Sequence, residues 1–335
     1  MTGPSPTASR ERILSGFRPT GPTHVGHLVG ALGNWVELQE QHDCFFFIAD
    51  WHALTSDYGD TSRLRGYVLE LAADWLAVGL DPKRAALFVQ SDVPEHAELY
   101  LLLGMITPLG WLERVPTYKE QKAQIQGKDL ETYGFLGYPV LQAADILLYK
   151  PRWVPVGEDQ VAHLELVREI ARRFNGLYGP VFPEPQPKLT SSPRLPGTDG
   201  RKMSKSYGNA IGLGEEPGAI RERVRGMVTD PARARRSDPG NPEVCPVFAF
   251  HRVFSPPTQV ARIDAECRTA AIGCTDCKAL MADRLVERLT PIRDRRTATL
   301  ARPDTLRDML ADGARRARAV AAATLAEARR AMGLA

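Results

Sequence analysis

Long apolar runs are missing from this sequence, and nothing in it approaches the roughly 18 residues that a membrane helix needs. Its first residues, MTGPSPTASR, lack the apolar centre of a secretory signal, and we expect residues 1–11 to form a flexible leader. Five cysteines in a chain of 335 residues are too few for a disulfide framework without export. These absences together predict a cytoplasmic protein with no membrane partner.

An excess of one charge is also missing, because 43 Lys and Arg residues stand against 40 Asp and Glu residues. Charged residues at 25% and aromatic residues at 7% exclude a disordered, collagen-like or coiled-coil chain. Residues 213–335, however, carry 22 basic and 16 acidic side chains, a net charge of +6. This basic third favours a polyanion as partner, although a solvated surface can have the same composition.

Short apolar runs alternate with segments of helical periodicity in the first half of the chain. Runs rich in Phe, Ile, Leu and Val occupy residues 12–17, 44–50, 85–90 and 152–156. Helical spacing follows the second and fourth of them, at 66–80 and 160–174. This alternation predicts the α/β class, with a doubly wound parallel sheet that binds ligands beyond the carboxyl ends of its strands.

The second half has a different pattern. Residues 183–201 contain five prolines and a Gly-rich end, which predicts a loop leaving the sheet. Beyond it the pattern is mostly helical, and residues 303–332 form an Ala/Arg-rich amphipathic stretch. We therefore expect an α/β domain at 12–212 and a smaller helical domain at 213–335.

The segment SGFRPTGPTHVGHLVGAL, residues 15–32, follows the first predicted strand. Its glycines allow tight turns and a close approach of the backbone to a ligand. His24 and His27 flank the point where a helix should begin, and a helix N-terminus suits phosphate oxygens. Two imidazoles there can donate hydrogen bonds to developing charge. A Gly-rich turn with two incidental histidines is the alternative.

A second candidate phosphate site is RKMSKS, residues 201–206, at the end of the Pro/Gly loop. Lys202 and Lys205 stand on either side of Ser204, where they could neutralise a departing pyrophosphate. A solvated basic loop has the same composition.

YPVLQAAD places Tyr138, Gln142 and Asp145 on one face of a predicted helix. An aromatic ring, an amide and a carboxylate could then line one pocket wall. A buried carboxylate rejects ligands that lack a matching donor, because leaving it unpaired is costly. The apolar neighbours of Asp145 argue against a surface acid.

Four of the five cysteines lie in the predicted helical domain with the spacing C-x21-C-x6-C-x2-C: Cys245, Cys267, Cys274 and Cys277. Four converging thiolates suit a tetrahedral zinc ion or an iron–sulfur cluster, and free buried cysteines are the third reading. Cys44, in a predicted strand, has the character of a small core residue.

HVGH at 24–27 and KMSKS at 202–206, in this order, resemble the paired ATP motifs of class I aminoacyl-tRNA synthetases. DWHALT at 50–55, YPVLQAADILLY at 138–149 and VPVGEDQ at 154–160 narrow the resemblance to the bacterial tryptophanyl-tRNA synthetases. It extends from about Arg12 to Leu334.

The resemblance implies a Rossmann-like catalytic domain and a tryptophan–tRNA ligase that works as a homodimer. Such an enzyme joins tryptophan to ATP, held with Mg²⁺, to form tryptophanyl-adenylate and pyrophosphate, and then transfers tryptophan to the 3′ end of tRNA. The resemblance assigns charge stabilisation during catalysis to His24, His27, Lys202 and Lys205.

The resemblance also implies the binding residues. Those for ATP are Arg18, Pro19, Thr20, Gly26, His27, Gly157, Glu158, Asp159, Leu195, Lys202, Met203, Ser204, Lys205 and Ser206. Those for tryptophan are Asp145, which would accept the indole N–H, Tyr138 and Gln160 beside the ammonium group, Gln142, and His52. Gln142 stands where many relatives have Met.

The four cysteines resemble those of the members of this family that bind a 4Fe-4S cluster, with zinc as the alternative. Their first gap is one residue shorter than that pattern. Arg233, Arg235 and Arg236, in the segment 229–243, could pair with tRNA phosphates or form a solvated loop. The related tyrosyl enzyme and a non-catalytic paralogue that binds tryptophan or tRNA are the rival readings.

Overall fold

The computed structural model describes residues 10–115, 130–157, 160–189 and 195–334. Five parallel strands form one sheet with the order β3-β2-β1-β4-β5. The strands are β1 Arg12–Phe17, β2 Asp43–Ile48, β3 Ala85–Val89, β4 Trp153–Val156 and β5 Gln186–Leu189. The predicted α/β class and parallel sheet are confirmed.

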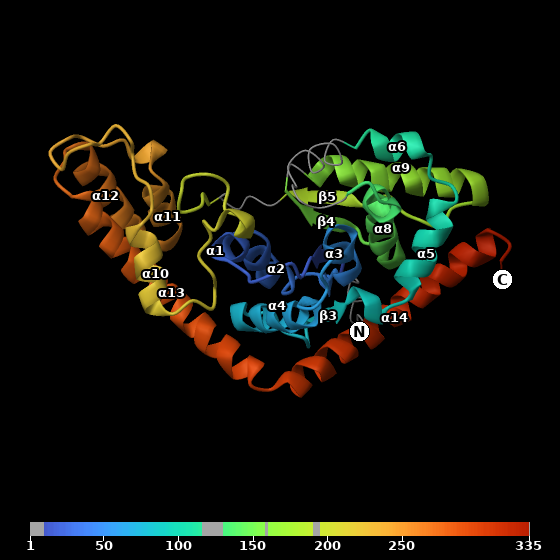
Figure 1. Ribbon diagram of the computed structural model, residues 1–335. Helices are drawn as coiled ribbons and strands as arrows, with labels where there is room; N and C mark the ends of the chain where they lie inside the picture. The colour runs from blue at the N-terminus through green and yellow to red at the C-terminus, as the bar shows by residue number, and fades with distance from the viewer. Residues whose placement is uncertain (1–9, 116–129, 158–159, 190–194, 335) are drawn as a thin grey trace, which may run out of the picture.

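Helices connect the strands and continue beyond the sheet (Figure 1). Those in the first half are α1 Val25–His27, α2 Gly33–Leu38, α3 Asp50–Asp57, α4 Leu64–Val78, α5 Glu95–Gly104, α6 Leu109–Glu113, α8 Tyr133–Tyr149 and α9 Val161–Tyr178. Those that follow are α10 Pro217–Arg225, α11 Pro246–Phe254, α12 Pro257–Arg268, α13 Cys274–Leu300 and α14 Pro303–Ala331. No helix among these described residues is long and apolar enough to cross a membrane.

Alternate side chains of the strands pack into two separate hydrophobic cores, one on each face of the sheet. Phe45 and Phe47 of β2 pack with α5, α8 and α9, whereas Phe46 and Ile48 pack with α2 and α4. Because successive side chains of a strand point to opposite faces, one strand can serve both cores. Helices on both faces make the sheet doubly wound.

The strand β5 corrects one prediction, because residues 183–201 are not loop throughout. β5 pairs with β4 from Gln186 to Leu189 and contains Pro187. Proline removes a hydrogen-bond donor and is tolerated mainly on edge strands. β5 lies at one edge of the sheet, which explains how a Pro-rich segment can still form a strand.

The opposite edge of the sheet is covered by α14, the C-terminal helix, which runs beneath the sheet in Figure 1. Gly313 of α14 lies directly on the backbone of Leu87, where an added Cβ would be 1.9 Å from the Leu87 carbonyl oxygen. Arg316 donates hydrogen bonds to the carbonyl oxygens of Pro82 and Ala85 at 2.6 and 2.9 Å. Exposed strand edges invite aggregation, and here the last helix of the chain protects β3.

The helices α10, α11 and α13 share a third core with the segments that carry the two predicted phosphate motifs. Val25 at the start of α1 and Leu28 directly after it pack there with Leu195 and Met203. This core fixes residues 195–203 against the first turn after β1. The division of the chain at residue 212 stays a prediction.

Replacing Gly313 with Ala should lower the free energy of unfolding by about 1–3 kcal/mol, because the added methyl group overpacks the contact with β3. Gly66→Ala in α4 is the matched control, since a Cβ at this exposed position meets nothing within 4 Å. We expect it to raise stability by about 0.5–1 kcal/mol. Urea denaturation would measure both, and equal stabilities would contradict this packing.

Candidate active site

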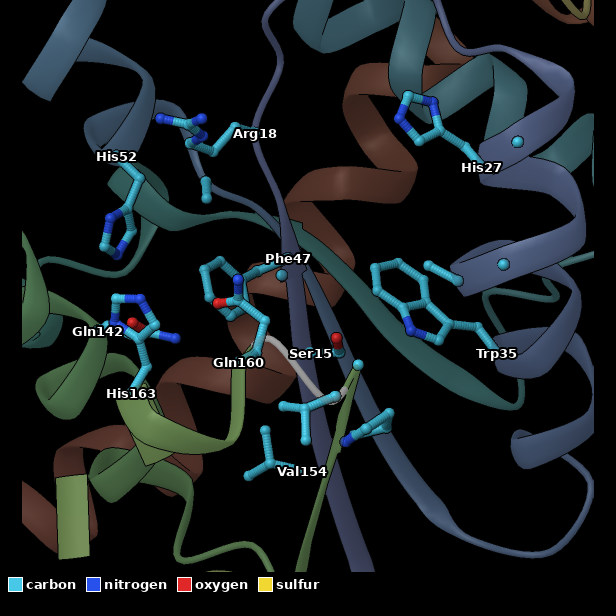
Figure 2. A pocket seen from close by; sticks show the side chains of 18 of the residues that line it. Ser15, Arg18, His27, Trp35, Phe47, His52, Gln142, Val154, Gln160 and His163 are labelled. Atoms are coloured by element: carbon cyan, nitrogen blue, oxygen red, sulfur yellow. The ribbon is translucent and has the colours of Figure 1, made fainter. Parts of the chain in front are cut away.

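A cleft of about 1200 Å³ opens at the carboxyl ends of the strands. Gly16 of β1, Phe47 of β2, Val156 of β4 and Leu189 of β5 line its floor. Figure 2 shows His52, Gln142 and His163 on one side of the cleft and His27 and Trp35 on the other. This is the position at which a parallel α/β sheet binds its ligands.

The two predicted phosphate motifs meet at one end of the cleft. His24 precedes the first residue of α1, and its ring stacks on that of His27 with centroids 3.5 Å apart. The Lys205 ammonium donates a hydrogen bond to the Gly21 carbonyl oxygen at 2.6 Å. Gly21 has φ +127°, a backbone angle that other residues rarely adopt. The fold thus joins segments about 180 residues apart in sequence.

The electrostatics of this end favour neutral imidazoles beside a cation. Burial and then the Lys205 charge lower the pKa of His24 to about 4. Burial, His24 and Lys205 lower the pKa of His27 to about 2. Burial also lowers the pKa of Lys205 to about 8, although Asp74 opposes this shift. At pH 7 the two histidines are therefore neutral hydrogen-bonding groups, and Lys205 is mostly charged.

Only some of the other residues predicted to bind ATP line the cleft. Those that line the cleft are Arg18, Gly26, Gly157, Leu195, Lys202 and Met203. Pro19, Thr20, Ser204 and Lys205 are not among its lining residues. The backbone N–H of Ser204 donates to Asn209 at 2.8 Å, which fixes the turn between the two lysines. Glu158, Asp159 and the side chain of Ser206 lie outside the described residues.

All five residues predicted for tryptophan line the cleft: Tyr138, Gln142, Asp145, Gln160 and His52. The first three lie on α8, and His52 lies on α3 directly after β2. Gln160 precedes the first residue of α9. The i, i+4, i+7 spacing thus presents one face of α8 to the cleft.

Asp145 is 1% exposed and is held by hydrogen bonds to both carboxylate oxygens. His52 Nε2 lies 2.8 Å from Oδ2, and His96 Nδ1 lies 2.6 Å from Oδ1. The side-chain amide of Gln90 donates to both oxygens at 2.8 and 2.9 Å. Burial by itself would raise the pKa of Asp145, but the two histidines outweigh burial and lower it to about 2. The carboxylate is thus ionised inside the core and is not a surface acid.

Gln90 and His96 were not predicted from the sequence. Gln90 ends the third predicted strand, so the rule that ligands bind beyond strand ends could have identified it. His96 lies in α5 with no exposed surface, and no local motif distinguishes it from a core histidine.

The side chain of Arg233 is neither free to pair with tRNA phosphates nor part of a solvated loop, the two predictions for the 229–243 segment. It is 9% exposed, and its guanidinium donates to the carbonyl oxygens of Arg236 and Ile272 at 3.0 and 2.6 Å. A residue held in this way by backbone oxygens neither reaches a tRNA phosphate nor forms a solvated loop. Arg235 and Arg236 are exposed.

The four predicted metal-binding cysteines are half-buried and close enough to influence one another. Burial, followed by the charges of Cys245, Cys267 and Cys274, raises the pKa of Cys277 to about 12. Among the described residues, however, no three His, Cys, Asp or Glu side chains are arranged to hold a metal ion. Cys44 is 1% exposed in β2, as expected of a core residue.

Comparison with known proteins agrees with this geometry. The family model of the class I tRNA synthetases for Trp and Tyr (W and Y) matches residues 7–290. A tryptophan–tRNA ligase of Thermotoga maritima is 56% identical over 325 residues, which cover 96% of this chain and 99% of that protein. One from Aquifex aeolicus is 45% identical and covers 96% of this chain and 100% of its own length.

Among solved structures, a Campylobacter jejuni tryptophanyl-tRNA synthetase in complex with ADP and tryptophan is 34% identical. It superposes with a TM-score of 0.88 over 96% of this chain and 100% of its own. On this match over nearly the whole length, together with a cleft that joins the two predicted phosphate motifs to a buried carboxylate, the chain belongs to the bacterial tryptophanyl-tRNA synthetases of class I.

Proposed function

We propose that this chain activates L-tryptophan with ATP and then transfers tryptophan to the 3′ end of its tRNA. The observation that carries the proposal is the cleft itself. One end holds His24, His27 and Lys202, which suit phosphate, with Lys205 bonded to Gly21 beside them. The other end holds Asp145 among residues of α8. A nucleotide and an amino acid bound in one cleft can react directly.

The phosphate end suits in-line attack of the tryptophan carboxylate on the α-phosphorus of ATP. That attack forms tryptophanyl-adenylate, and the bond to pyrophosphate breaks without a covalent enzyme intermediate. Neutral His24 and His27 donate hydrogen bonds to the phosphate oxygens, whereas Lys202 and Lys205 neutralise the departing pyrophosphate. Catalysis is thus mainly positioning and charge stabilisation.

Mg²⁺ would accompany ATP in this site. We expect the substrate phosphates, rather than a cage of carboxylates, to supply most of its ligands. Its chemistry is to neutralise charge on the phosphate oxygens.

The amino-acid end suits an indole ring. Asp145 is ionised and can only accept hydrogen bonds, so it favours a ligand with an N–H group at this depth. Tyr138 and Gln160 line the same cleft and would contact the substrate ammonium group. A ligand that lacks the N–H forgoes a further hydrogen bond to the buried carboxylate, which costs affinity.

Amino-acid-dependent ATP–pyrophosphate exchange tests the proposal, with tryptophan and tyrosine compared on the purified protein. We expect exchange with tryptophan and little with tyrosine. Exchange with tyrosine alone would overturn the assignment of the amino-acid end. No exchange with either, from folded protein, would favour a binding paralogue.

Lys205 should make activation depend on pH. Its lowered pKa of about 8 means that its charge is lost as pH rises through that value. We therefore expect kcat/KM for ATP to fall above about pH 8, since this parameter reports the free enzyme.

Lys205→Arg should shift that fall above about pH 9, because a guanidinium keeps its charge. Lys205→Ala should slow adenylate formation far more than it weakens tryptophan binding. Comparable losses in both would remove Lys205 from the chemistry.

We also propose that Cys245, Cys267, Cys274 and Cys277 hold a 4Fe-4S cluster in a structural role, with zinc as the alternative. Four cysteine thiolates are the donor set of such a cluster. Burial and then the other three thiols raise the pKa of Cys277. Thiolates that repel one another in this way are stabilised by a bound cation. The arrangement described here is not itself that of a metal site, so the side chains would have to turn on binding.

Anaerobic purification followed by iron, sulfide and zinc analysis tests this second proposal. We expect about four iron and four sulfide per chain, lost in Cys277→Ser and kept in Cys44→Ala. About one zinc ion per chain, without iron, would show that the four cysteines bind zinc and not an iron–sulfur cluster. Protein free of iron, sulfide and zinc would contradict both.

Two partners complete the proposal. Arg235 and Arg236, exposed in the basic C-terminal third, supply positive charge for tRNA phosphates. A second copy of the chain would cover exposed apolar side chains along α5, just after it, and at the starts of α6 and α8, which are Leu101, Met105, Leu109 and Tyr133. Their exposed fractions range from 55% to 71%, an amount that favours an interface.

A further inference from the structure

We propose that His96 is a positioning residue for tryptophan selection, which holds the Asp145 carboxylate in the orientation that accepts the indole N–H. The inference rests on the proposed role of Asp145. It adds a residue that does not touch the substrate, because His96 is not among the residues that line the cleft.

His96 of α5 bridges two successive turns of α8. Its Nδ1 atom lies 2.6 Å from Asp145 Oδ1, and its Nε2 atom lies 2.9 Å from the hydroxyl of Tyr149. Asp145 and Tyr149 are four residues apart, so their side chains lie one above the other on the same helix face. One imidazole can therefore reach both and fix α5 against α8.

The direction of these hydrogen bonds follows from the carboxylate. Because ionised Asp145 only accepts, Nδ1 of His96 donates to it. A neutral imidazole that donates through Nδ1 accepts the Tyr149 hydroxyl proton at Nε2. This hydroxyl keeps its proton because burial and nearby carboxylates raise the pKa of Tyr149 well above its usual value. Tyr149, His96 and Asp145 form a chain of hydrogen bonds with one polarity.

The surroundings make His96 hard to replace. Its ring has no exposed surface and packs against Phe47, Phe88 and Tyr149 at centroid distances of 5.9, 6.2 and 5.5 Å. Water cannot take over a hydrogen bond in such an apolar environment, so losing the imidazole leaves Asp145 with an unmet acceptor.

His96 and His52 each bond a different oxygen of the Asp145 carboxylate. His52 lines the cleft and bonds Oδ2, whereas His96 lies behind Asp145 and bonds Oδ1. Gln90 spans both oxygens and accepts the backbone N–H of His52 at 3.4 Å. Without His96 only Gln90 still bonds Oδ1, so the orientation of the carboxylate toward the ligand N–H is less firmly fixed.

The test compares tryptophan with an analogue in which sulfur replaces the indole nitrogen, so that the N–H is absent. His96→Phe keeps a ring of similar shape without either nitrogen. We expect it to raise the KM for tryptophan in ATP–pyrophosphate exchange by about tenfold or more, with kcat changed little. The inhibition constant of the sulfur analogue should change by less than about twofold.

Further variants keep the test decisive if His96→Phe does not fold. His96→Asn retains a donor near Nδ1 and should recover part of the tryptophan affinity. Tyr149→Phe removes the last hydroxyl of the chain and should raise the KM for tryptophan by a smaller factor. Tyr100→Phe, which deletes a hydroxyl of α5 that pairs with Tyr133, is the matched control and should leave both constants unchanged.

Equal changes for tryptophan and the analogue, or no change for either, would overturn the role of His96. The variant Asp145→Asn shows whether such a result contradicts only the role of His96 or also the proposal that Asp145 accepts the indole N–H. If Asp145→Asn also affects both ligands equally, Asp145 does not read the indole N–H. If it affects tryptophan alone while His96→Phe does not, Asp145 keeps its role without His96.

Discussion

An ionised carboxylate buried at the centre of the α/β core is the interaction on which the amino-acid end of the cleft depends. Taking Asp145 out of water is costly unless donors replace the lost hydration. Here those donors come from α3, from Gln90 directly after β3 and from α5, while Asp145 itself lies on α8. Four parts of the fold must therefore come together before the charge of Asp145 has its hydrogen-bond donors. Their packing also fixes the position of the cleft wall that faces the ligand.

The phosphate end is held together by packing and by a second buried ion pair. Val25 and Met203 share one hydrophobic core with α10, α11 and α13. Arg296 of α13 bonds Asp74 of α4 at 2.6 Å, and Asp74 favours the charge of Lys205. By pairing with Asp74, Arg296 opposes the burial that raises the pKa of this carboxyl. The last helix, α14, continues along the sheet and covers its edge at Gly313.

Much of this arrangement could be predicted from local patterns. The strand at 12–17 and the helical face of Tyr138, Gln142 and Asp145 follow from hydrophobic periodicity, which is a property of neighbouring residues. The network behind Asp145 could not be predicted, because Gln90 and His96 meet it only through tertiary packing. Pro-rich β5 was missed because proline disfavours strands except at an edge, and edge position is not visible in sequence.

We propose that the Asp145 carboxylate, oriented from behind by His96, selects the substrate. A crystal structure of the chain with bound tryptophan would show whether it does. We expect an indole nitrogen about 2.8–3.0 Å from an Asp145 oxygen, with His96 still bonded to Oδ1 and to Tyr149. An indole nitrogen bonded elsewhere, with Asp145 still enclosed by its two histidines and Gln90, would contradict it.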